Sequence, residues 1–245
     1  MDLHVHRYGT PQAPRMLLLH GMTEDGTTWP DLVDRWGAAW DLVAVDLRGH
    51  GRSPRFTQDE RPRATEVMLD DVVALLDAQP APVVLLGHSL GGNLALRAAH
   101  RRPGAVRALV LEDPTSPLDP AGTERFVAGN LAFLDSMADR DGQVERMRAQ
   151  TRWSHPEIDA WADSKARVDR EAVTGGLAVR GEWDTLWDTV GVPTLVVVPP
   201  GPTMSPAAPR SPLVRRVVVP GTGHCVRRDE PEAFCSAVED FLAAL

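Results

Sequence analysis

The sequence predicts an α/β fold: a mostly parallel, doubly wound sheet with a helical cap inserted into it. Short apolar runs, typical of strands buried on both faces, alternate along the chain with helical patterns. Over residues 114–188 the apolar runs stop, and the segments there are helical or irregular. We therefore expect a core formed by residues 1–113 and 189–245 and a cap formed by residues 114–188.

The first half of the chain supplies most of the expected sheet. Residues 3–8 alternate apolar and polar side chains, as an edge strand does. Buried strands are expected at residues 16–19, 42–45, 83–86 and 106–111. Helices are expected at residues 28–36, from about residue 64 to 76, and at 90–100, the last ending before Pro103.

The sheet resumes after the insertion. Strands are expected at residues 192–198 and 213–219, separated by a proline-rich stretch at 199–212. A last helix follows, with Asp229 as its expected N-terminal cap and Pro231 in its first turn. Its buried stripe is expected to comprise Phe234, Val238, Phe241, Leu242 and Leu245.

Composition excludes several classes of protein. The 26 basic and 34 acidic side chains give a net charge of −8, which argues against nucleic acid as the main partner. Two cysteines cannot form a disulfide framework. No apolar run reaches the roughly 20 residues that span a bilayer, and the N-terminal residues do not resemble a signal peptide. We therefore expect a cytoplasmic protein without a membrane partner, and the oligomeric state stays open.

The strongest chemical signal is the run Gly87-His88-Ser89-Leu90-Gly91-Gly92, between an expected strand and an expected helix. In this context the serine sits on a sharp turn with its hydroxyl exposed at the edge of the sheet. The flanking positions must be small because the turn leaves no room for side chains, and glycines fill them. The pattern therefore predicts that Ser89 is a nucleophile.

A second signal is His20-Gly21-Met22, directly after a buried strand. Acyl transfer needs two N–H donors aimed at the developing oxyanion. One usually belongs to the residue after the nucleophile, and the other to a loop after an earlier strand. We therefore expect the backbone N–H groups of Leu90 and Met22 to form the oxyanion hole.

The general base is expected to be His224, in Gly221-Thr222-Gly223-His224. Of the eight histidines, it alone follows a late strand on a glycine-rich loop. His4 and His6 share one face of the edge strand and form a possible metal pair, but two ligands do not make a site. We therefore expect no metal.

Several motifs together carry a family resemblance. They are His20-Gly21, Asp46-Leu47-Arg48-Gly49-His50-Gly51-Arg52-Ser53, the Ser89 turn, Val192-Pro193-Thr194-Leu195 and Gly223-His224. With them the chain resembles a capped α/β-hydrolase. The resemblance implies a Ser-acid-His triad in that chain order and a cap at the position of residues 114–188.

The acid of the triad is missing from its usual place. The family usually places it after the Val-Pro-Thr-Leu strand, where this chain reads Pro199-Pro200-Gly201-Pro202. Asp113 is the favoured substitute. It stands at the end of the strand after the nucleophile helix, where some members of the superfamily carry their acid, and the order Ser89, Asp113, His224 is kept. Chain alternation sends Glu112 to the opposite side. Glu112, the cap carboxylate Asp184 and a site without an acid remain as alternatives.

Aromatic side chains in the insertion are candidates for binding an apolar part of the substrate, although most should serve packing. The candidates are Trp153, Trp183, Trp187 and Phe133.

These features predict a serine hydrolase that cleaves an ester, lactone or thioester of a small, partly apolar molecule through an acyl-enzyme, without a cofactor. A lyase or cyclase using Ser89 and His224 as an acid/base pair is one alternative. A binding protein without turnover is the other. The loop that lacks its acid is the feature that favours both alternatives.

Overall fold

A computed structural model describes residues 3–174 and 183–245. The described residues form a seven-stranded sheet with the order β1-β3-β2-β4-β5-β6-β7. Only β1 runs antiparallel to its neighbour. The strands are β1 (Val5–Gly9), β2 (Arg15–Leu19), β3 (Asp41–Val45), β4 (Val83–His88), β5 (Val106–Glu112), β6 (Thr194–Val198) and β7 (Val214–Val218). The expected fold class is confirmed.

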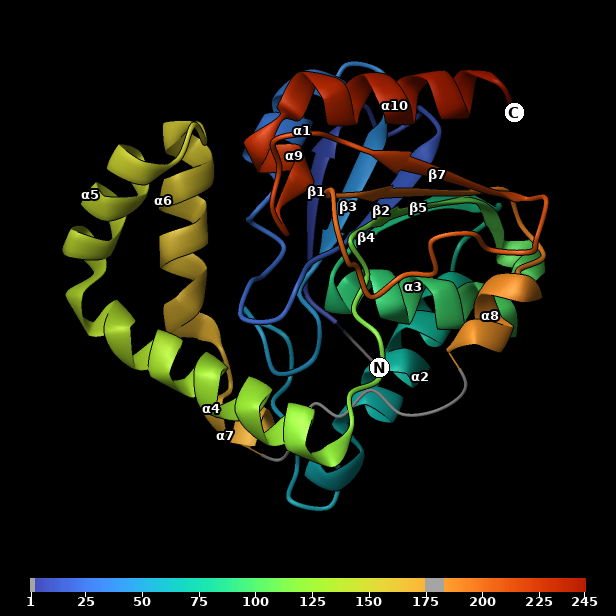
Figure 1. Cartoon of the computed structure of the whole chain (residues 1–245). Coiled ribbons are helices and arrows are strands. Elements are labelled where there is room, and N and C mark those ends of the chain that lie inside the picture. Colours follow the sequence, from blue (N-terminus) through green and yellow to red (C-terminus); the bar gives the residue numbers. More distant parts are fainter. Residues whose placement is uncertain (1–2, 175–182) are drawn as a thin grey trace.

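Helices cover both faces of the sheet (Figure 1). One face packs against α1 (Pro30–Trp36) and α10 (Pro231–Ala243), and the other against α2 (Ala64–Asp77), α3 (Leu90–Arg101) and α8 (Asp184–Asp188). A single strand contributes side chains to both faces of the sheet: in β2, Leu17 and Leu19 belong to one apolar cluster, and Met16 and Leu18 belong to the other. This is the alternation that a strand buried on both faces requires. The short segments are η1 (Arg61–Arg63), η2 (Pro103–Ala105), η3 (Met137–Asp139), η4 (Lys165–Arg167) and α9 (Val226–Asp229).

The cap helices stand to one side of the sheet (Figure 1). They are α4 (Pro120–Ser136), α5 (Arg140–Gln150), α6 (His155–Ser164) and α7 (Arg170–Thr174). The cap has a small apolar core of its own, built on Val144, Ile158 and Trp161. The side chains of Asp119, Asp139 and Ser154 cap the N-termini of α4, α5 and α6.

The last part of the expected insertion packs elsewhere. Helix α8 contacts α3, and Trp187 is fully buried in the apolar cluster of the sheet. The chain has therefore returned to the core by Asp184, earlier than the expected boundary at residue 188.

The expected cap of the last helix is wrong. Asp229 ends α9, while α10 begins at Pro231 after Glu230, without a side-chain cap. The Asp229 carboxylate accepts hydrogen bonds from Gly223 N–H and from Trp153 Nε1. The short turn of α9 thus directs this carboxylate toward the His224 loop and the cap. Among the described residues, no helix is long and apolar enough to cross a membrane.

Candidate active site

Ser89 occupies a strained turn between β4 and α3. Its φ of 51° lies in the left-handed region, and its ψ is −112°. The turn fits only because its neighbours lack side chains: a Cβ on Gly91 would lie 2.1 Å from the Leu19 carbonyl oxygen, and one on Gly87 would lie 2.3 Å from that of Gly91. Strain of this kind persists where the surrounding structure enforces it, and it is common at active sites. The Ser89 side chain remains partly exposed.

His224 and Asp113 meet at the carboxyl edge of the sheet. Asp113 Oδ2 lies 2.6 Å from His224 Nδ1. Asp113 directly follows β5, has a φ of 34°, and donates its backbone N–H to the Val197 carbonyl on β6. Strands β4 and β5 are parallel neighbours, and His88 at the end of β4 pairs with Glu112 at the end of β5. The next residues, Ser89 and Asp113, therefore follow the two strands at the same edge of the sheet. Asp113 contacts only one of the two ring nitrogens of His224.

The described residues include no hydrogen bond between the Ser89 hydroxyl and His224. Catalytic hydrogen bonds are often long in unliganded enzymes and tighten only with substrate bound. The side chain of His224 is 53% exposed, which leaves it room to adjust.

The electrostatics favour a basic His224. Partial burial alone would lower the pKa of the imidazole, but the hydrogen bond and the negative charge of Asp113 outweigh it, so the pKa of His224 is raised. Asp113 Oδ1 is buried without a hydrogen-bond partner among the described residues. The carboxylate is therefore committed to the histidine through its other oxygen.

The two alternative acids lie elsewhere. Glu112 is fully buried on the opposite side of β5, where its Oε1 accepts the backbone N–H of Arg227 at 2.8 Å. Burial raises the pKa of Glu112, and the nearby charge of Arg227 opposes that rise. Asp184 is exposed at the start of α8. Neither carboxylate makes a hydrogen bond to His224 within the described ranges.

The expected oxyanion donors, the N–H groups of Leu90 and Met22, belong to two segments next to the Ser89 turn, which is called the elbow below. Leu90 is the first residue of α3, so its N–H belongs to the unpaired donors of a helix N-terminus. The loop that carries Met22 packs closely on the elbow, because a Cβ on Gly21 would lie 2.7 Å from His88 Nδ1 and 3.5 Å from Ser89 Cβ. Thr23, with a φ of 64°, turns the backbone immediately after Met22.

Three other histidines near these loops are fully buried and neutral. Burial lowers the pKa of His20, of His50 to about 3, and of His88. The ring of His20 joins two loops, since its Nε2 accepts Leu47 N–H and its Nδ1 faces the Gly21 carbonyl oxygen. Of these rings and His224, only that of His224 is exposed and paired with a carboxylate.

Sequence reasoning missed a buried ion network behind His224. Arg228 is completely buried and lies 2.6 Å from both Glu24 and Glu157. Glu157 belongs to cap helix α6, whereas Glu24 follows the Met22 loop, so the network joins the cap to the core. Removing one member would leave a buried charge uncompensated. The adjacent arginines after His224 were the only sequence signal, and they resemble an ordinary exposed pair.

The aromatic candidates are divided between cap and core. Phe133 packs against Trp161 inside the cap. Trp153 packs there too, and Arg228 lies 4.9 Å from the centre of its ring. Trp183 donates its Nε1 hydrogen to the Met204 carbonyl and packs against Trp187. Trp187 is fully buried in the core, so it serves packing and does not contact substrate.

Comparison with known proteins agrees with this architecture. A profile of the Alpha/beta hydrolase family matches residues 16–237. The chain is 38% identical over 164 residues to lipase LipV of Mycobacterium tuberculosis, a match that covers 66% of this chain and 57% of the lipase. It is 28% identical to the pimeloyl-[acyl-carrier protein] methyl ester esterase of Xanthomonas campestris, over 99% of this chain and all of the relative.

A solved structure shows the same fold over almost the whole chain. An esterase from Thermogutta terrifontis superposes with a TM-score of 0.76 at 24% identity, covering 99% of this chain and 93% of that one. The family profile itself spans most of the sequence. The chain therefore belongs to the alpha/beta hydrolase family of enzymes.

Proposed function

We propose that this enzyme is a serine hydrolase that cleaves an ester, lactone or thioester of a small, partly apolar molecule. The observation that carries the proposal is the 2.6 Å contact between Asp113 Oδ2 and His224 Nδ1, at the sheet edge where the Ser89 elbow also lies. A nucleophile, a base and an orienting acid then share one site. The similarity to a lipase and a methyl ester esterase supports ester bonds as the class of substrate.

The proposed reaction proceeds in two halves. His224 Nε2 removes the Ser89 hydroxyl proton as Oγ attacks the carbonyl carbon, and the N–H groups of Leu90 and Met22 stabilise the oxyanion. The imidazolium, held by Asp113, then protonates the leaving alcohol or thiol, and the acyl group stays on Ser89. In the second half, His224 takes a proton from water as the water oxygen attacks the acyl carbon. The imidazolium returns that proton to Ser89 Oγ as the acyl–oxygen bond breaks and the acid leaves.

The ordinary acid position lacks a carboxylate, and this gap was the reason to consider a lyase, a cyclase or an inactive binding protein. The contact between Asp113 and His224 supports the presence of the acid that both alternatives take to be lost. Ester hydrolysis is therefore the function that the site supports best.

Covalent labelling tests the nucleophile. We expect a fluorophosphonate to label Ser89, because attack by Oγ on phosphorus displaces fluoride and leaves a stable phosphonyl ester. Intact-protein mass spectrometry and peptide mapping measure the extent and place of labelling. His224→Ala should slow labelling strongly, because the base is gone. A chain that stays unlabelled, or that reacts equally fast without His224, would contradict an activated Ser89.

The pH dependence of turnover follows from the Asp113–His224 pair. The base must be neutral to accept the proton, and its pKa is raised above the ordinary histidine value of about 6.5. We therefore expect kcat/KM to be full at alkaline pH and to fall as the pH drops through a midpoint above about 6.5. Initial rates on p-nitrophenyl acetate across the pH range measure this midpoint. A midpoint well below 6.5 would argue against Asp113 as the partner.

A further inference from the structure

A second cluster of chemically active side chains lies away from the triad, where the edge strand meets the end of β3. His4 directly precedes β1, and His6 lies on it two residues later, on the same face. Antiparallel pairing sets Val5 opposite Val45, so His4 stands across from Asp46, whose N–H donates to the His4 carbonyl at 2.9 Å. One ligand atom from each of His4, His6 and Asp46 can be chosen so that all lie within 4.8 Å of one another.

The geometry points to a divalent metal site of the zinc class, formed by His4, His6 and Asp46. His6 Nε2 lies 3.0 Å from Asp46 Oδ1. Bonds of 2.0–2.1 Å in a tetrahedral site place neighbouring ligand atoms about 3.3 Å apart, so this pair already has nearly the required spacing. The His4 and His6 rings lie edge to face with their centres 4.7 Å apart, and a ring nitrogen of His4 lies within 4.8 Å of the other two ligand atoms. Two imidazoles and a carboxylate suit zinc with its fourth position open.

The surrounding hydrogen bonds hold the ligands in place. The Asp46 carboxylate accepts Gly26 N–H at 2.7 Å on one oxygen and Arg52 N–H at 2.8 Å on the other. The Ser53 hydroxyl accepts His4 N–H and donates to the Asp46 carbonyl. Partners of this kind orient metal ligands and raise affinity. They fix the backbone at both ends of the cluster before any ion arrives.

The charge of Asp46 is available to a cation. Its neighbours are already neutralised, since Asp25 pairs with Arg167 and Asp163 pairs with Arg140. Asp46 shares a hydrogen bond with His6, and an ion bound by both side chains would replace the shared proton, which leaves to solvent.

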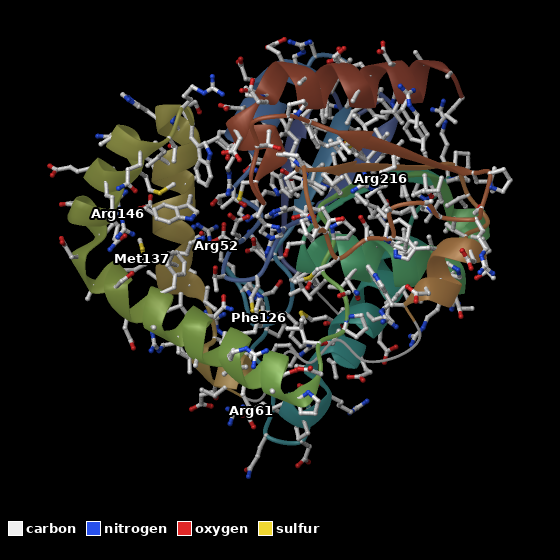
Figure 2. All side chains as sticks on the ribbon, in the orientation of Figure 1. Arg52, Arg61, Phe126, Met137, Arg146 and Arg216 are labelled. Atoms are coloured by element: carbon white, nitrogen blue, oxygen red, sulfur yellow. The ribbon has the colours of Figure 1, made fainter. Side chains whose placement is uncertain are left out.

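An entry path reaches the site. A cavity of about 390 Å³ is lined by His6, Asp46 and Arg52 from the core and by Asp163 and Arg167 from the cap. Figure 2 shows Arg52 between the core and the cap helix α6. Two of the three ligands, His6 and Asp46, therefore border this cavity, whereas His4 does not line it. A bound ion would join the segment before β1 to the loop after β3, just below the cap.

Metal titration of the tag-free protein tests the proposal. We expect Zn²⁺ to bind at about one ion per chain by calorimetry, and Co²⁺ to give the intense visible bands of a four-coordinate ion. His4→Ala and His6→Ala should each weaken Zn²⁺ by at least the roughly 100-fold seen when an outer partner is lost. His155→Ala removes an exposed histidine of the cap and serves as the matched control. His224→Ala separates this site from ion binding at the triad.

Thermal unfolding gives a readout independent of activity. Saturating Zn²⁺ should raise the Tm of the parent protein, of His155→Ala and of His224→Ala, because an ion that binds only the folded state stabilises it. The rise should vanish in His4→Ala and His6→Ala. Two results would overturn the site: no Zn²⁺ binding at millimolar metal, or binding and a Tm rise that both variants retain. Neither result bears on the triad, which is tested by labelling of Ser89.

Discussion

Ser89→Ala is expected to remove nearly all ester hydrolysis. The variant removes the only atom that forms the proposed acyl-enzyme, and loss of a nucleophile in a triad enzyme typically costs about 10⁶ in kcat. The fold should survive, because serine and alanine meet the same strain at a φ of 51° and the hydroxyl makes no hydrogen bond among the described residues. Initial rates on p-nitrophenyl acetate, with circular dichroism to verify folding, measure the effect.

A matched serine-to-alanine variant outside the site separates loss of the nucleophile from a general effect of substitution. Ser136→Ala removes a hydroxyl that bonds only to the Phe133 carbonyl within cap helix α4, and it should retain turnover within about twofold. Hydrolysis by folded Ser89→Ala within about tenfold of the parent rate would rule out Ser89 as the nucleophile, because a triad that has lost its nucleophile keeps only the small residual catalysis of the oxyanion hole and binding. Loss of activity in both variants would instead point to a general sensitivity of the protein.

Much of the fold could be predicted because its signals are local. A run such as residues 83–86 is apolar on both faces, which only a strand covered on both sides satisfies, and β4 contains it. The elbow was equally readable, since Gly87 and Gly91 leave no room for side chains and identify the turn that carries Ser89. Alternation along β5 also separated Glu112 from Asp113, which lie on opposite sides of the strand.

Other features depend on contacts between distant parts of the chain. Arg228 lies 71 residues from Glu157 and 204 from Glu24, and no local pattern indicates that these charges are buried together. Asp229 before Pro231 has the sequence of a helix cap, yet tertiary contacts direct its carboxylate to Trp153 and Gly223. The burial of Trp187 could not be predicted either, because a tryptophan in a helical segment does not show whether it packs against the cap or against the core.

Asp113→Asn is the second large expected effect. Asparagine keeps the shape of the side chain and tolerates the φ of 34° at this position, so the backbone should hold. It removes the negative charge that stabilises the imidazolium, and it can hold the imidazole in the wrong tautomer. In a serine protease triad the same change costs about 10⁴ in kcat, and we expect a loss of that order here.

The pH profile distinguishes this positioning role from a merely structural one. Asp113 is the group that raises the pKa of His224, so the acidic limb of kcat/KM should move to lower pH in the asparagine variant. Glu112→Gln, the control on the neighbouring residue, should cost far less activity and move the limb much less, because Glu112 acts on His224 through its charge alone, without the hydrogen bond that Asp113 makes. Turnover within tenfold of the parent, with an unshifted limb in Asp113→Asn, would transfer the acid to another group. A large loss in both variants, with lowered Tm, would show that the strand end tolerates no change. The limb measured on the residual activity would then decide the assignment, since loss of the Asp113 charge and hydrogen bond should move it further than loss of the Glu112 charge.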